Sequence, residues 1–157
     1  MLGDGRKAAG EMESPEVLSL LRLLWEVDDG LRLTSRRIKS RYHISGRERF
    51  LLKLLASYPG IDLPGLTGFV GASRPEVLRG LKRLQQRGFV ELQPAAPGVT
   101  AGYRLSPEGE RVGAAWQGTV EQAVRVALRS MPREAIQSGT GLLLLLATAL
   151  RRSAKVS

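Results

Sequence analysis

The sequence predicts a mostly α-helical protein with one small β-hairpin, an α+β fold class, and three observations support this prediction. A basic stretch at residues 73–87 has clear signals for the start and end of a helix. A shorter apolar stretch at 62–70 precedes it across a tight Gly-Ala turn. Two strand-like runs at 89–92 and 103–105 follow, around a loop rich in Pro and Gly. A helix, a turn, a longer basic helix and a hairpin in this order predict a winged helix-turn-helix.

The stretch at 73–87 is the candidate recognition helix. Ser73 and Glu76 form an S-x-x-E capping box, and Gly88 supplies the left-handed residue that commonly ends a helix. Its apolar residues recur at helical period: Val77, Leu78, Leu81 and Leu84. The opposite face is mostly basic, and consists of Pro75, Glu76, Arg79, Lys82, Arg83 and Gln86. Such a face on a lone helix is more often simply solvated, but the neighbouring helix and hairpin favour insertion into the major groove of DNA.

Composition narrows the functional class. The 157 residues are 43% apolar, enough for a core, and the formal net charge of +9 with a pI near 10.8 predicts attraction to polyanions, with nucleic acid favoured over a membrane surface. Cysteine is absent and His43 is the single histidine, so no disulfide, metal site or cofactor is expected. No nucleophile, base and orienting group recur at a usable spacing, which argues against an enzyme.

The N-terminal helix is expected to begin at Ser14-Pro15 and is apolar on most sides through Val27. A helix of this kind must be buried on most sides, which suggests that it packs against a second subunit. Beyond Gly30 the composition becomes basic, with only Glu48 opposing eight cations: Arg32, Arg36, Arg37, Lys39, Arg41, Arg47, Arg49 and Lys53. A patch flanking the DNA backbone and an ordinary solvated face explain this run equally well.

The remaining helices follow from caps and apolar periodicity. Ser45 and Glu48 form a second capping box, opening a helix with a core stripe of Phe50, Leu51, Leu54 and Leu55. Ser106-Pro107-Glu108 starts a further helix whose apolar stripe extends through Trp116 to Leu128. After Pro132, a last helix contains the run 142–150, which is about half the roughly 20 residues that span a bilayer and is therefore expected to be buried in protein.

These elements divide the chain into four segments. We expect a disordered leader at 1–13 without a secretory signal, in a cytoplasmic protein, and an N-terminal dimerisation helix with its basic run at 14–43. A winged helix-turn-helix lobe occupies 44–106, and C-terminal dimerisation helices occupy 107–157. The expected wing, 93–102, carries no charged residue, which is unusual for a loop that contacts DNA.

Several motifs resemble the MarR family of bacterial transcription regulators. They are Leu24-Trp25-Glu26-Val27-Asp28-Asp29-Gly30-Leu31, Tyr58-Pro59-Gly60-Ile61, Leu81-Lys82-Arg83-Leu84-Gln85-Gln86-Arg87-Gly88-Phe89-Val90 and Leu105-Ser106-Pro107-Glu108-Gly109. The resemblance covers residues 15 to about 152. It implies a homodimer that presents two recognition helices to a pseudo-palindromic operator in double-stranded DNA, with half-sites about 34 Å apart, and acts as a repressor.

The resemblance also implies where ligands bind. Many relatives release DNA when a small aromatic or phenolic ligand enters a cleft beside the dimerisation helices, and the corresponding residues are Trp25, Asp28, Arg37, Tyr42 and His43. Core packing and ordinary salt bridges are the alternative explanation for these five. The expected DNA contacts are Ser73, Arg74, Glu76, Arg79, Lys82, Arg83 and Arg104, with Arg79 nearest the middle of the outward face.

Two departures from the family pattern favour a second hypothesis. The wing has Pro97-Gly98-Val99 where relatives carry D-x-R, and Pro75-Glu76 stands where relatives place small hydroxyl residues. Glu76 can accept a hydrogen bond from cytosine, but its default effect beside phosphates is repulsion. The alternative is a degenerate winged-helix dimer that binds a protein partner, as an antirepressor does, with weak or no specific DNA binding.

Overall fold

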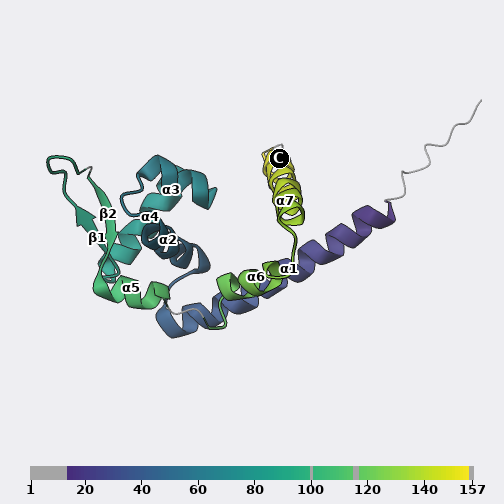
Figure 1. Cartoon of the computed structure of the whole chain (residues 1–157), viewed down its shortest axis with the longest axis horizontal. Helices are drawn as coiled ribbons and strands as arrows, with labels where there is room; N and C mark the ends of the chain where they lie inside the picture. Colours follow the sequence, from purple (N-terminus) through teal and green to yellow (C-terminus); the bar gives the residue numbers. More distant parts are fainter. Residues whose placement is uncertain (1–13, 100, 115–116, 156–157) are drawn as a thin grey trace, which may run out of the picture.

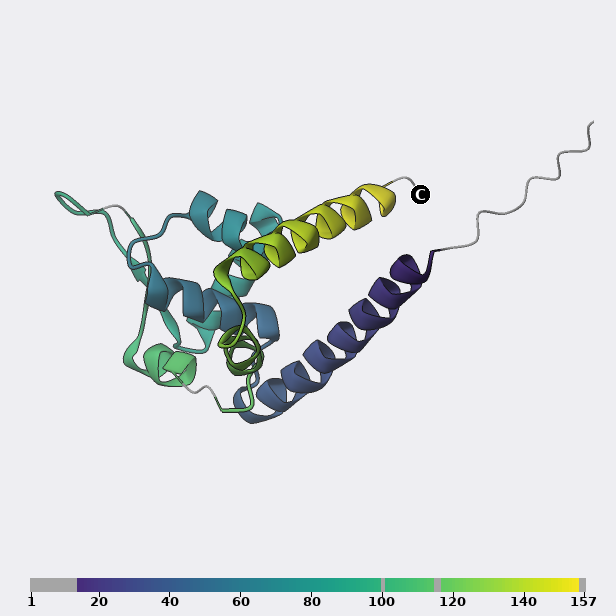
Figure 2. The same cartoon turned by 45° about the vertical axis from the view of Figure 1, so that its right-hand side comes forward.

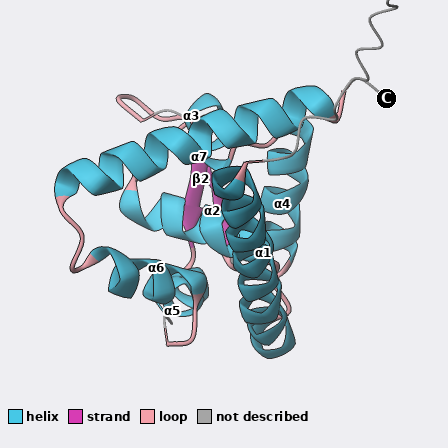
Figure 3. Ribbon diagram, turned by 90° about the vertical axis from the view of Figure 1, so that its right-hand side faces the viewer, coloured by secondary structure: helices cyan, strands magenta, loops and turns pink. Residues whose placement is uncertain are grey.

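The computed structural model describes residues 14–99, 101–114 and 117–155. The chain begins with four helices, α1 (Pro15–Tyr42), α2 (Gly46–Ser57), α3 (Leu63–Val70) and α4 (Arg74–Gln86). An antiparallel hairpin of β1 (Val90–Gln93) and β2 (Gly102–Leu105) follows, and then α5 (Pro107–Ala114), α6 (Val120–Leu128) and α7 (Arg133–Ser153). The described part is thus mostly helical (Figure 3), and the predicted winged helix-turn-helix is confirmed.

A lobe built from α2 to α5 and the hairpin contains the core, while α1 extends away from it as a long rod with α6 beside it (Figures 1 and 2). The core lies where α2, α3, α4 and β1 meet, and its fully buried side chains include Ile44, Leu52, Leu66, Leu81 and Leu84. Val112 of α5 belongs to the same core, so the lobe extends past residue 106.

Local caps fix the helix ends as the sequence indicated. At α2, the Ser45 hydroxyl accepts from the Glu48 amide at 3.1 Å, and the Glu48 carboxylate accepts from the Ser45 amide at 2.7 Å. Gly88 has φ 75°, the left-handed conformation that lets the chain leave α4 and enter β1. Val90 pairs with Leu105 in the hairpin, and the ladder ends at Gln93 and Gly102.

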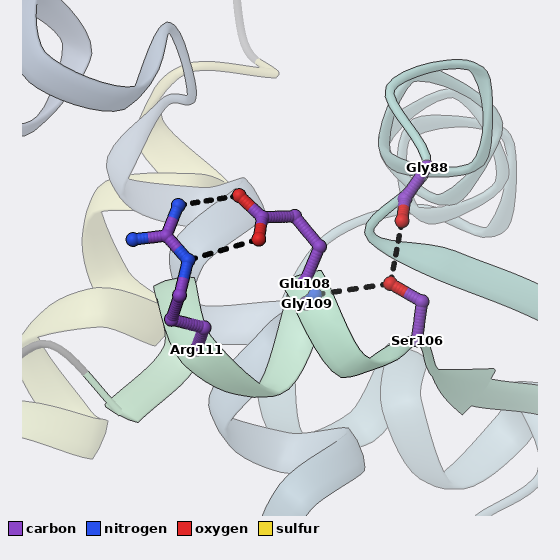
Figure 4. Close-up of polar contacts among 5 residues, drawn as sticks. All are labelled: Gly88, Ser106, Glu108, Gly109 and Arg111. Atoms are coloured by element: carbon purple, nitrogen blue, oxygen red, sulfur yellow. Dashed lines mark hydrogen bonds and ion pairs between the residues drawn. The ribbon is translucent and has the colours of Figure 1, made fainter.

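The Leu105-to-Gly109 motif has a structural explanation, shown in Figure 4. The Ser106 hydroxyl donates to the Gly88 carbonyl oxygen at 2.5 Å and accepts from the Gly109 amide at 3.0 Å. A Cβ at Gly109 would lie 1.9 Å from the carbonyl oxygen of Phe89, so only glycine fits there. Glu108 and Arg111 pair on the outside of the same turn at 2.5 Å. The motif therefore joins the end of the recognition helix to the start of α5.

Two expectations about helices are wrong. Phe50 does not belong to the core stripe of α2, because its side chain is 39% exposed and Leu52 is buried instead. The helix expected from Pro107 to Leu128 is two helices, because Gly118 adopts φ 70° and Thr119 caps a new helix by accepting from the Gln122 amide. Trp116 lies outside the described residues.

The final helix also differs from expectation. The apolar run of α7 is not buried within its own chain: Leu143, Leu144, Leu145 and Leu150 are exposed, Leu145 by 71%. The N-terminal half of α1 has the same character, with exposed Leu18, Leu21, Leu23, Trp25 and Val27. No helix among the described residues is long and apolar enough to cross a membrane.

Candidate nucleic-acid interface

The outward face of α4 is defined by how the helix packs. Val77, Gly80, Leu81 and Leu84 are buried against the lobe. At Gly80 an added Cβ would lie 2.9 Å from Leu51 Cδ1, so this glycine lets α2 and α4 approach closely. Helical geometry then directs Arg79 and Lys82 away from the lobe, and both are exposed. Arg74, in the first turn, is exposed as well.

Glu76 is held by its own helix. Its carboxylate accepts from the Ser73 amide at 2.8 Å and from the Ser73 hydroxyl at 2.7 Å. It also pairs with Arg47 of α2 at 3.6 Å. The hydrogen bonds from the Ser73 hydroxyl and amide lower the pKa of Glu76, so it is ionised at neutral pH. Its charge is therefore partly compensated before any ligand arrives.

Arg83 is anchored to a buried carboxylate. Its Nε donates to Glu48 Oε1 at 2.6 Å, while the other Glu48 oxygen caps α2. Glu48 is 6% exposed, and the Arg83 side chain remains 54% exposed. Burial raises the pKa of Glu48, but hydrogen bonds from the Ser45 amide and Arg83 outweigh it and leave the pKa below its usual value. Arg83 is thus oriented by α2 through its Nε, while more than half of its side chain stays exposed.

Arg104 is paired within the hairpin. It stands opposite Glu91 in the strand register, and its guanidinium binds the Glu91 carboxylate at 3.0 Å. Beyond this pair, the described part of the wing turns through an isolated Ala96–Val99 bridge with Gly98 at φ 76°.

The seven residues expected to contact DNA therefore differ in whether their side chains already bind another residue of the chain. Arg74, Arg79 and Lys82 are exposed and form no salt bridge within the described part of the chain, although the charge of Arg79 helps to lower the pKa of Glu76. Arg83 and Arg104 each share an acid, and Ser73 and Glu76 bond to each other. Three exposed cations outside any salt bridge give this helix face a positive surface, which suits an anionic polymer.

The five residues of the expected ligand cleft are not brought together. Arg37 and Tyr42 line a hollow of about 430 Å³ between the end of α1 and the start of α6, beside Arg41, Gly118 and Thr119. Trp25 is 67% exposed and lies about 18 Å from Arg37 along the helix.

The other two members of that set have local roles. Asp28 pairs with Arg32 at 2.8 Å on the same helix. His43 ends α1 in the left-handed conformation, φ 54°, with its amide donating to the Lys39 carbonyl oxygen at 2.8 Å.

Sequence reasoning missed the part played by Arg49, which it counted only within the basic run. The side chain is 3% exposed, donates to the Val112 carbonyl oxygen at 2.8 Å and pairs with Glu121 of α6 at 3.1 Å. Its position three residues before Leu52, on the buried side of α2, was the signal available. Arg49 connects the lobe to α6.

We compared the chain with known protein families, curated proteins and solved structures. No protein-family model matches the chain, and no curated protein matches it. Among solved structures, a MarR family transcriptional regulator from Streptomyces coelicolor, Sco3205, in complex with DNA, matches with a TM-score of 0.67 and 17% identity over 88% of this chain and 94% of that chain. The Staphylococcus aureus MepR–DNA complex matches with a TM-score of 0.66 and 13% identity over 87% and 99%. A MarR family protein from Bacillus stearothermophilus has 20% identity, a TM-score of 0.57 and coverage of 89% and 99%.

These similarities show that the chain has the fold of the MarR-family transcription regulators over most of its length, as the sequence motifs indicated. The likeness includes two proteins whose structures contain DNA.

Proposed function

We propose that the protein is a MarR-like, DNA-binding transcription regulator rather than an enzyme, and that it acts in the cytoplasm. The observation that carries this proposal is the outward face of α4, where Arg74, Arg79 and Lys82 lie exposed and form no salt bridge among the described residues. In a helix-turn-helix that face enters the major groove. Sequence is specified there by side chains that reach base edges, and phosphate contacts fix the position.

Each basic residue has a distinct proposed role. Arg79, nearest the middle of the outward face, is the candidate for a bidentate contact to guanine. Arg74 and Lys82 bind phosphates, and Arg83 does so through the nitrogens that Glu48 leaves free. Glu76 is the candidate acceptor for a cytosine amino group, since the carboxylate lies at the start of α4.

The active form we propose is a homodimer. The exposed leucines of α1 and α7 would leave a large apolar surface in water as a monomer, and such surfaces mark interfaces. A twofold dimer would present two α4 helices to a pseudo-palindromic operator, with half-site centres about 34 Å apart, and would repress by occupying it.

We also propose that a small ligand regulates DNA binding, and that it binds at one site. The hollow lined by Arg37 and Tyr42 lies between α1 and α6, where a small aromatic or phenolic ligand would contact a cation and a ring together. A ligand there would bias the position of α6 against the lobe. Titration of the protein–DNA complex with phenolic acids tests this, and Arg37→Ala is expected to abolish any release.

The decisive experiment is selection of bound sequences from a random duplex pool at about 50 and 200 mM salt, because binding by charge alone falls steeply across this range. We expect the selected duplexes to contain an inverted repeat, and we expect this repeat to be enriched at the higher salt concentration as well. Arg79→Ala is expected to cost about 1–3 kcal/mol of binding free energy and relax preference at one base pair. A uniform loss across all sequences would instead make Arg79 a phosphate contact.

The second candidate is a winged-helix dimer that binds a protein partner, as an antirepressor does. The uncharged wing favours it, because the loop that would follow a groove offers no cation between residues 93 and 102. An acidic partner that mimics DNA fits the basic face equally well. Selection that enriches no sequence, together with a dimer by light scattering, would favour this candidate over the first.

A further inference from the structure

Four of the cations on α1 form two groups. Arg22 pairs with Glu26, and Arg32 pairs with Asp28, each one helical turn apart. Arg36 and Lys39 lie further along the helix, are exposed, and have no acidic partner among the described residues. The second group is therefore uncompensated positive charge at the end of α1 that adjoins the lobe.

These two cations border a groove that reaches the recognition helix. Together with Ser35, Ser45 and Gly46, they line a surface hollow of about 330 Å³ where α1 meets the start of α2. The same three small residues line an adjoining hollow of about 430 Å³, whose far wall is α4. The two hollows therefore adjoin at these residues and together reach from α1, across the N-terminal end of α2, to α4; the pair is called the groove below.

The wall formed by α4 carries Arg79 and Arg83, and the acids of the groove, Glu48 of α2 and Glu76 of α4, are already engaged. Glu48 is buried beneath Arg83 at 2.6 Å, and Glu76 pairs with Arg47 at 3.6 Å. The groove therefore has basic residues on both sides and acids that are compensated locally. A polyanion entering it would meet net positive charge along its whole length.

The direction of the groove matters for DNA. A recognition helix in a major groove about 12 Å wide has a sugar–phosphate strand on each side. With Val77 and Leu81 facing the lobe, helical geometry turns Arg83 and Glu76 toward the start of α2. One phosphate strand would therefore run along this flank of α4, over Ser45 and Gly46, toward α1.

We propose that Arg36 and Lys39 bind the DNA backbone beside the recognition helix, so that the end of α1 supplies the phosphate contacts that the uncharged wing does not. This inference rests on the proposed DNA-binding function. Arginine suits a bidentate contact to one phosphate, and lysine acts as a compact charge on the next. Such contacts strengthen binding to every sequence and specify none.

The test compares Arg36→Ala, Lys39→Ala and the control Arg133→Ala, which removes one exposed cation from the start of α7. Affinity for the selected operator and for an unrelated duplex is measured by fluorescence anisotropy between 50 and 200 mM salt. Each phosphate contact contributes about 0.9 to the slope of log affinity against log salt, so loss from both subunits should reduce the slope by about 1.8 per substitution.

The expected result is an equal loss for both duplexes at low salt, about threefold to tenfold, with the smaller salt slope and an unchanged melting temperature. Arg36→Lys, which keeps the charge, should retain most of the affinity. Slopes and affinities that match those of Arg133→Ala would overturn the inference and leave the proposed function intact. A change in the selected sequence would also overturn it, because these residues would then read bases. If the wild-type protein binds no DNA, the proposed function fails and the inference fails with it.

Discussion

The substitution Glu48→Gln tests two opposite effects of the buried Glu48 carboxylate on DNA binding, its negative charge and its orientation of Arg83. One oxygen of Glu48 accepts from the Ser45 amide at 2.7 Å, and the other accepts from Arg83 Nε at 2.6 Å. Glutamine also serves at the third position of a capping box, so the cap of α2 is expected to survive. With its oxygen on Ser45, however, the glutamine amide turns its NH₂ group toward Arg83, which then meets a donor where it had an acceptor.

The cost in stability follows from that single lost interaction. Hydrogen bonds to charged groups contribute about 1.5–3 kcal/mol. The Arg83 side chain is half exposed and can turn to water, so we expect the lower end of this range, a loss of about 1.5–2 kcal/mol in the free energy of unfolding. Urea denaturation followed by circular dichroism measures it, and a fully unfolded variant would show that Glu48 is needed for more than this contact.

The effect on DNA binding has a diagnostic sign. The substitution removes one negative charge per subunit, which by electrostatics alone would tighten binding. Arg83 would at the same time lose its fixed orientation, and immobilising such a side chain costs about 0.5–1.5 kcal/mol, so we expect about twofold to tenfold weaker binding per half-site. The same substitution in an Arg83→Ala background should not weaken binding further. Tighter binding by Glu48→Gln, or equal weakening in both backgrounds, would refute the argument that Glu48 orients Arg83.

Other predictions concern the lobe. Gly109→Ala should destabilise the protein by more than about 3 kcal/mol, because its Cβ would lie 1.9 Å from the rigid carbonyl oxygen of Phe89; a melting curve within a few degrees of wild type would contradict this. Gly68→Ala, in α3 with nothing within 4 Å of the added Cβ, should stabilise by about 1 kcal/mol in urea unfolding, and a loss would show that the site is not open. Since the folded-state pKa values of Glu48 and Glu121 lie below 4.5, the ordinary value for a glutamate, their contribution to stability is complete above that pH and falls as the pH drops through the folded values. Unfolding free energies measured from pH 6 to pH 3 should therefore decline below about pH 4.5, and less steeply in Glu48→Gln.

The exposed apolar faces of α1 and α7 show why burial could not be assigned from the sequence alone. Apolar residues cover most sides of α1, which is why the sequence predicts that it packs against a second subunit, and this stays a prediction. Periodicity could not indicate which chain provides that partner. Within one chain Leu145 stays largely exposed, so the predicted burial of residues 142–150 is not met there, and their burial against a second copy stays a prediction.

The sequence by itself determined the order of the elements and most helix ends. A capping box such as Ser45 and Glu48 depends on groups three residues apart, so the same atoms meet whatever the rest of the chain does. The helical period of the apolar side chains in α4 likewise predicted its buried face, with Val77, Leu81 and Leu84 all in the core.

Only the tertiary structure decided which charges are available. Arg83 meets a carboxylate 35 positions away, and Arg49 meets a carbonyl 63 positions away, contacts that no local pattern contains. The exposure of Phe50 also depends on how α2 is placed by the rest of the chain, whereas the break at Gly118 has a local cause in its left-handed conformation and the Thr119 cap. The physical reason is range: caps and periodicity act within one or two turns of helix, whereas the pairing and burial of a charge are set by whichever segments the fold brings beside it.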